Sequence, residues 1–169
     1  AVPSATGTIL NDDTAPAPSL SVAATNASLN EGNSGSTAFT FTVTRAGDTT
    51  GSSTASYAVT GSGANPASAS DFAGGAFPAG TVSFAAGETS KVITVSVAAD
   101  TVVEPNEGFT LTLSSPSTGT TLGTASATGT ILNDDSSGTQ LVKAVNVGGG
   151  AVTASNGVVF QAVSFEVMR

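Results

Sequence analysis

Residues 37–45 read TAFTFTVTR, and this stretch decides the fold class of the chain. Phe39, Phe41 and Val43 recur at every second position, and threonines fill most of the positions between them. Successive side chains of a β-strand point to opposite faces of its sheet, so this alternation places the apolar residues on one face. The stretch therefore predicts a half-buried strand.

The same period of two continues on both sides of that stretch. Turns rich in Gly, Pro, Asn and Ser separate the alternating segments, and no segment shows the 3.6-residue period of a helix. We therefore predict an all-β fold, a Greek-key immunoglobulin-like β-sandwich of about seven strands. The further expected strands are residues 20–22, 55–59, 82–84, 93–97, 109–113 and a segment ending at 131.

One ten-residue string occurs twice in the chain. SATGTILNDD stands at residues 4–13 and again at 126–135, an offset of 126 − 4 = 122 residues. An interval of this size suits one β-sandwich domain and exceeds a solenoid repeat. We therefore expect residues 1–17 to hold the last strand of a preceding repeat plus a linker, or an exchanged strand. The domain then runs over 18–135, and 136–169 holds a linker and the β-rich start of a following domain.

The composition argues against several classes of function. The chain has no Cys and no His, which excludes disulfides, thiolate chemistry and the usual zinc ligands. Its 12 acids and 4 basic residues give a net charge of −8, so nucleic acid is not an expected partner. Its apolar runs are too short for membrane insertion. Glu104 and Glu107 could form a glycosidase pair, but the absence of Trp and the single Tyr argue against an enzyme.

Nine of the twelve acids lie at the ends of the expected strands. If the strands alternate in direction, seven of these acids converge at one pole, and such a pole is stable only with protonation or bound cations. Calcium is the simplest neutraliser because it accepts six to eight oxygen ligands. Turn preference alone explains any single acid, Glu31 included. The seven are Glu31, Asp71, Asp100, Glu104, Glu107, Asp134 and Asp135.

Two long segments carry a resemblance to a known family. They are SDFAGGAFPAGTVSFAAGETSKVITVSVAADTVVEPNEGFTLTLSSP at residues 70–116 and GTASATGTILNDD at 123–135. In the order and spacing of their motifs they resemble the Calx-beta domain, a calcium-binding β-sandwich of sodium–calcium exchangers and many bacterial surface proteins. Its marks here are Asp71-Phe72, TVSFAAGETSK, the acidic segment from Asp100 to Glu107, and the closing ILNDD.

The resemblance implies a set of calcium ligands. It assigns side-chain oxygens to the seven acids, a backbone carbonyl to Val102, and an amide oxygen to Asn133, where some members of the family carry Asp. Ala99 departs from the family, since members with several ions have a second consecutive Asp there. The expected number of calcium ions is therefore one to three.

A second, shorter resemblance lies near the end of the sequence. VKAVNVGGGAVTASNGVVFQA at residues 142–162 is similar to the opening strands of malectin-like carbohydrate-binding domains. Two strands joined by a glycine-rich turn explain the same residues equally well. Carbohydrate or a cell-surface ligand is therefore a further candidate partner, without assigned binding residues.

The favoured function is a calcium-binding structural or adhesive module of an extracellular bacterial protein, secreted or displayed on the cell surface. Calcium would rigidify the domain and its junction with neighbouring domains. The alternative is a subunit of an extracellular filament, in which the duplicated strand is exchanged between identical subunits.

Overall fold

The computed structural model of the chain describes residues 3–4, 6–8, 15–137, 152–153 and 159–160. The chain divides into two compact units, residues 1–136 and 137–169. Within the described residues, no helix has the length and apolar character needed to cross a membrane.

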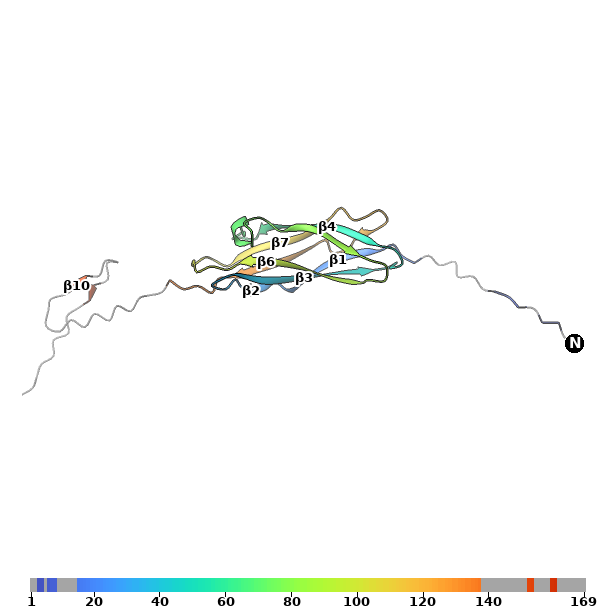
Figure 1. Cartoon of the computed structure of the whole chain (residues 1–169), viewed down its shortest axis with the longest axis horizontal. Helices are drawn as coiled ribbons and strands as arrows, with labels where there is room; N and C mark the ends of the chain where they lie inside the picture. The colour runs from blue at the N-terminus through green and yellow to red at the C-terminus, as the bar shows by residue number, and fades with distance from the viewer. Residues whose placement is uncertain (1–2, 5, 9–14, 138–151, 154–158, 161–169) are drawn as a thin grey trace, which may run out of the picture. The chain divides into compact units, whose positions relative to one another are not determined.

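The first unit is a sandwich of two sheets (Figure 1). One sheet contains, in spatial order, β6 (Ser90–Ala98), β3 (Ser36–Ala46), β1 (Ser19–Asn26) and β8 (Thr121–Leu122). The other contains β2 (Ser28–Asn30), β9 (Ser126–Leu132), β7 (Glu107–Ser114), β4 (Ser53–Ser62) and β5 (Ala79–Phe84).

The predicted all-β sandwich is confirmed, with nine strands in place of about seven. The two additional strands are β2 and β8, which have only three and two residues and so show no readable alternation. Both pair in parallel, β2 with β9 and β8 with β1. The chain passes from β1 to β2, and so from one sheet to the other, at Ala27, just after a register shift between Ala24 and Asn26.

Four phenylalanines fill the core near one end of the sandwich. The rings of Phe39, Phe41 and Phe72 lie 5.7, 5.9 and 5.5 Å from the ring of Phe109, each in an edge contact. All four side chains are fully buried, and such edge contacts add to the free energy of area burial. Phe72 follows the short 3-10 helix η1 (Ala69–Asp71), so its burial fixes the loop that carries Asp71.

The register of β3 and β6 defines the two ends of the sandwich. Ser36 lies opposite Ala98 at one end, and Thr44 lies opposite Ser90 at the other. The first end, which we call the acidic pole, holds Glu31, Asp71 and residues 99–107 and 133–136. The second end, which we call the arginine pole, holds Arg45 with the turns at 47–52 and 85–89.

The chain enters and leaves the sandwich at different ends (Figure 1). The carbonyl of Pro16 accepts a hydrogen bond of 2.8 Å from the backbone N–H of Asp48 at the arginine pole, whereas β9 ends at the acidic pole. Residues 3–4 and 6–8 of the N-terminal part are exposed and form no strand. The other residues of the first SATGTILNDD copy lie outside the described residues.

In the second unit, β10 (Val152–Thr153) and β11 (Val159–Phe160) form an antiparallel pair. Most of the predicted linker and of the predicted following domain lies outside the described residues. The malectin-like resemblance therefore stays a prediction.

Candidate metal centre

The acidic pole is built from four connections of the sandwich. Glu31 directly follows β2, Asp71 ends η1 between β4 and β5, and Asp100 lies two residues after β6. Glu104 lies in the loop between β6 and β7, and Glu107 begins β7. Asp134 and Asp135 complete the pole just after β9. Because neighbouring strands of each sheet fix these connections at one end, acids that are distant in sequence become neighbours in space.

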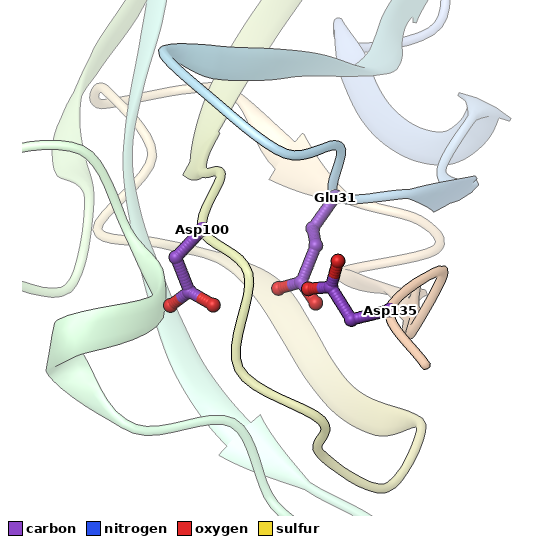
Figure 2. Close-up of side chains that lie close together, drawn as sticks. All are labelled: Glu31, Asp100 and Asp135. Carbon is purple, nitrogen blue, oxygen red and sulfur yellow. The ribbon is translucent and has the colours of Figure 1, made fainter. Parts of the chain in front are cut away.

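Glu31, Asp100 and Asp135 form the first of two groups of carboxylates. One carboxylate oxygen from each residue lies within 4.8 Å of the others. Figure 2 shows the three side chains, carried by three separate segments, converging on a common space. Glu31 is buried, with 4% of its surface exposed, so its charge is poorly solvated.

Asp135 in this first group carries an unpaired oxygen. Its Oδ1 accepts a hydrogen bond of 2.7 Å from the side-chain amide of Asn33, while its buried Oδ2 has no hydrogen-bond partner. The neighbouring Asp134 Oδ1 accepts a bond of 3.1 Å from the backbone N–H of Gly32. The loop after β2 thus holds this acidic segment in place and leaves one buried oxygen free for a ligand.

Asp71, Glu104 and Glu107 form the second group, again with carboxylate oxygens within 4.8 Å of one another. Asp71 is oriented by its own helix, because its Oδ2 accepts a hydrogen bond of 2.6 Å from the backbone N–H of Ser68. This contact belongs to a capping box at the start of η1.

Burial and mutual repulsion raise the pKa values of three glutamates at this pole. Burial, with the nearby Asp100, Glu104, Asp135 and Asp134 charges, raises the pKa of Glu31 to about 7. Burial, with a hydrogen bond to Asp71 and the charges of Asp71, Glu104 and Glu31, raises the pKa of Glu107 to about 7. Burial and the charges of Asp71, Asp100 and Asp135 raise the pKa of Glu104. The pole is therefore short of positive charge.

The basic side chains that the structure describes do not supply that charge. Arg45 lies at the other pole, where it binds backbone carbonyls. Lys91 pairs with Glu88 at 2.7 Å, which is the one ion pair among the described residues.

The donor set at the acidic pole fits a hard divalent cation. Two groups of three carboxylates, with no His or Cys in the chain, offer oxygen ligands alone, as calcium prefers. The unpaired Asp135 Oδ2 and the raised pKa values of Glu31 and Glu107 are the features that a bound cation would relieve.

Six of the nine predicted ligands fall within these two groups, and Asn133, Asp134 and Val102 fall outside both. The side-chain oxygen of Asn133 accepts hydrogen bonds from the backbone N–H groups of Glu104, at 3.4 Å, and Asp135, at 3.3 Å. The N–H of Val102 donates to Asp100 Oδ1 at 2.7 Å. The ligand roles of all nine residues stay predictions.

Two asparagines that were not predicted from the sequence hold the acids in place. Asn33 and Asn106 both contact the segment after β9, Asn33 through Asp135 and Asn106 by accepting the N–H of Asn133 at 3.0 Å. Their only signal in the sequence is that each lies within three residues of a predicted ligand.

The fold and the site define a β-sandwich module with a carboxylate-lined pole. The family model of the Calx-beta domain matches residues 13–135, and the chain belongs to this family.

Solved structures of related domains agree with this assignment. The apo-form Calx CBD1 domain is 25% identical, with a TM-score of 0.56, over 70% of this chain and 99% of that one. The calcium binding domain CBD12 of CALX1.1 is 27% identical, with a TM-score of 0.58, over 70% of this chain and 47% of that one. The chain thus spans about half the length of that relative. A search of curated proteins returned no match.

Proposed function

We propose that this chain is a calcium-binding structural module, in which calcium stiffens the sandwich at the acidic pole. The observation that carries the proposal is the pair of carboxylate groups, each with oxygens within 4.8 Å of one another and with no described basic side chain beside it. Calx-beta domains are calcium-binding modules, and the CALX1.1 relative is described as a calcium binding domain.

We further propose that calcium also stiffens the junction with the segment that follows the domain. Asp134 and Asp135 lie two and three residues after β9 and directly before Ser136, after which the second unit of the chain begins. An ion held by Asp135 would restrain the chain at the point where it leaves the sandwich. No catalytic role is proposed for these carboxylates.

An extracellular bacterial setting, secreted or on the cell surface, suits this function. Millimolar calcium would saturate even weak sites of this kind. The polar Ser and Thr faces of the strands and the net charge of −8 favour a soluble, adhesive or structural surface protein. Neighbouring domains and a carbohydrate or cell-surface ligand are the proposed partners.

The test is a calcium titration combined with thermal and chemical unfolding of the full chain. Calcium at 100 times its Kd should add about 2.7 kcal/mol to the free energy of unfolding, because it binds only the folded state. Unfolding curves that coincide in calcium and in chelator would contradict the proposal.

Two matched glutamate substitutions locate the site. Glu107→Gln removes a carboxylate of the second group and should weaken calcium binding on the order of tenfold, or about 1.4 kcal/mol. Glu88→Gln removes a carboxylate at the arginine pole that pairs with Lys91, and should leave the isotherm unchanged. Equal calcium-binding isotherms for the two variants would show that calcium does not bind at the second group of carboxylates.

A second candidate function is a filament subunit that exchanges its duplicated strand. The observation that favours it is the identity of residues 4–10 with β9, a strand that pairs with two neighbours in its sheet.

A further inference from the structure

A five-residue loop connects β2 with β3, and it contacts the segments that carry all three acids of the first carboxylate group. The loop reads EGNSG at residues 31–35, so its first residue is Glu31. The carbonyl of its last residue, Gly35, accepts a hydrogen bond of 3.2 Å from the N–H of Ala99. Ala99 directly precedes Asp100. The main chain of this loop therefore ties together two of the three acids.

The loop also continues the pairing of β2 with β9. The two strands pair in parallel as far as Asn30 opposite Leu132, and the N–H of Glu31 then donates to the carbonyl of Leu132 at 3.2 Å. The next N–H, that of Gly32, donates to Oδ1 of Asp134 at 3.1 Å. Gly32 has a φ of +86°, a left-handed conformation that favours glycine and turns the chain away from β9. Past the end of β2, a carboxylate thus takes the place of a ladder carbonyl.

Asn33 provides the last contact of this series, and it holds the third acid of the group. Its Nδ2 donates a hydrogen bond of 2.7 Å to Oδ1 of Asp135. The other oxygen of that carboxylate, Oδ2, is buried without a hydrogen-bond partner. The bond therefore fixes the carboxylate of Asp135 beside that of Glu31 (Figure 2) and leaves Oδ2 to bind an ion.

The position of Asp135 needs such an anchor. Carboxylate oxygens of Asp135, Glu31 and Asp100 lie within 4.8 Å of one another, and repulsion between like charges favours turning Asp135 toward water. The backbone does not prevent this, because residues 133–137 form no strand. A hydrogen bond from an amide to a carboxylate opposes the repulsion. Since the amide of Asn33 is neutral, it does so without competing with a cation for the charge.

We propose that Asn33 is a positioning residue for the first carboxylate group. By holding Oδ1 of Asp135, it keeps Oδ2 in place to bind calcium together with Glu31 and Asp100. The same bond ties the segment that leaves the sandwich to the loop between β2 and β3 before calcium binds, so the ion meets a preformed site. The inference rests on the proposed function, since calcium is the ion proposed there.

The expected effect of removing the amide is on calcium affinity and not on the fold. Residues that orient a metal ligand without touching the metal typically change metal affinity by tenfold or more when they are substituted. Asn33 is exposed, so Asn33→Ala should weaken calcium binding on the order of tenfold and leave the unfolding curve in chelator unchanged. Ser34→Ala is the matched control, because Ser34 is exposed in the same loop and its side chain forms no hydrogen bond among the described residues.

A double-mutant cycle, measured by calcium titration of the full chain, tests whether Asn33 acts through Asp135. When Asp135→Ala is already present, Asn33→Ala should cause no further loss of affinity. When Asp71→Ala is present instead, an acid of the second group is missing and the tenfold loss should remain. The NMR signal of the Asn33 side-chain amide, recorded in chelator, should shift in Asp135→Ala and stay unchanged in Asp71→Ala.

Three results would overturn the proposal: equal calcium affinities of Asn33→Ala and Ser34→Ala, a loss that persists in Asp135→Ala or disappears in Asp71→Ala, or an amide signal that Asp135→Ala leaves in place. If the wild type binds calcium and one of these results appears, the positioning role alone is wrong. If the wild type binds no calcium, the proposed function fails, and the amide signal still decides whether Asn33 holds Asp135.

Discussion

The two ends of the sandwich handle buried charge in opposite ways. At the arginine pole, one buried guanidinium donates to the carbonyls of Gly51, Thr49 and Ala85 at 2.9, 3.1 and 3.0 Å. It also lies over the ring of Phe84, 5.5 Å from its centre. At the acidic pole, there are two groups of carboxylates. No basic side chain that the structure describes pairs with them. The chain's own carbonyls therefore solvate most of the charge at the arginine pole, where Nε of Arg45 alone has no partner, whereas the acidic pole needs a proton or an ion.

This difference predicts that the arginine pole stabilises the fold regardless of calcium. Arg45→Met keeps the apolar stem but takes away the donor of the Gly51 carbonyl and one of the two donors of the Thr49 and Ala85 carbonyls. We expect a loss of about 3 kcal/mol in the free energy of unfolding. Chemical denaturation should give the same loss in calcium and in chelator. Lys91→Met is the matched control, because solvent screens the exposed ion pair of Lys91 with Glu88 and its loss should change the free energy of unfolding little. A loss that appears only in calcium would show that the two ends are coupled.

The acidic pole should instead respond to pH, and with opposite signs in chelator and in calcium. The pKa values of Glu31 and Glu107 are raised to about 7, above their unfolded value of 4.5. The folded state therefore holds more protons than the unfolded state between pH 4.5 and 7, so stability in chelator falls as pH rises through this window. Water around the pole screens part of the repulsion, and we expect a change on the order of 2 kcal/mol.

Calcium reverses this dependence because it binds the ionised carboxylates. The apparent calcium affinity should fall as pH drops from 8 to 5, since protons compete for Glu31 and Glu107. Unfolding curves at several pH values, with calcium and with chelator, check both signs. If the free energy of unfolding in chelator did not change with pH, the acids would not repel one another in the folded protein.

The comparison of the two poles also shows what the sequence could predict. The seven acids follow from strand order, because loops at one end of a sandwich must share a pole. Their division into two groups does not follow, since it depends on local contacts such as the bond from the Ser68 N–H to Asp71. The short strands β2 and β8 are set by their partners β9 and β1 and leave no period in the sequence.

The burial of Arg45 follows from the sequence, although it was not predicted. It continues the inward series of Phe39, Phe41 and Val43 at the same spacing of two, so the alternation places it on the buried face. Only 4% of its surface is exposed. Its carbonyl partners come from two turns whose shape no periodic pattern fixes, and the sequence therefore could not show how this charge is satisfied.

The smallest expected effect concerns Asn133, which is either a calcium ligand or a residue that holds the backbone in place by hydrogen bonds. Its oxygen accepts two backbone N–H groups, and its Nδ2 donates to the carbonyl of Asp135 at 3.0 Å. If these bonds are its role, Asn133→Ala should cost about 1 kcal/mol in chelator as well as in calcium, because two partly buried backbone N–H groups lose their acceptor. Asn133→Asp keeps the acceptor and should recover part of that loss. If Asn133 is instead a calcium ligand, Asn133→Ala should leave stability in chelator unchanged and weaken calcium binding alone. Denaturation in chelator, followed by calcium titration of the same two variants, decides between these roles.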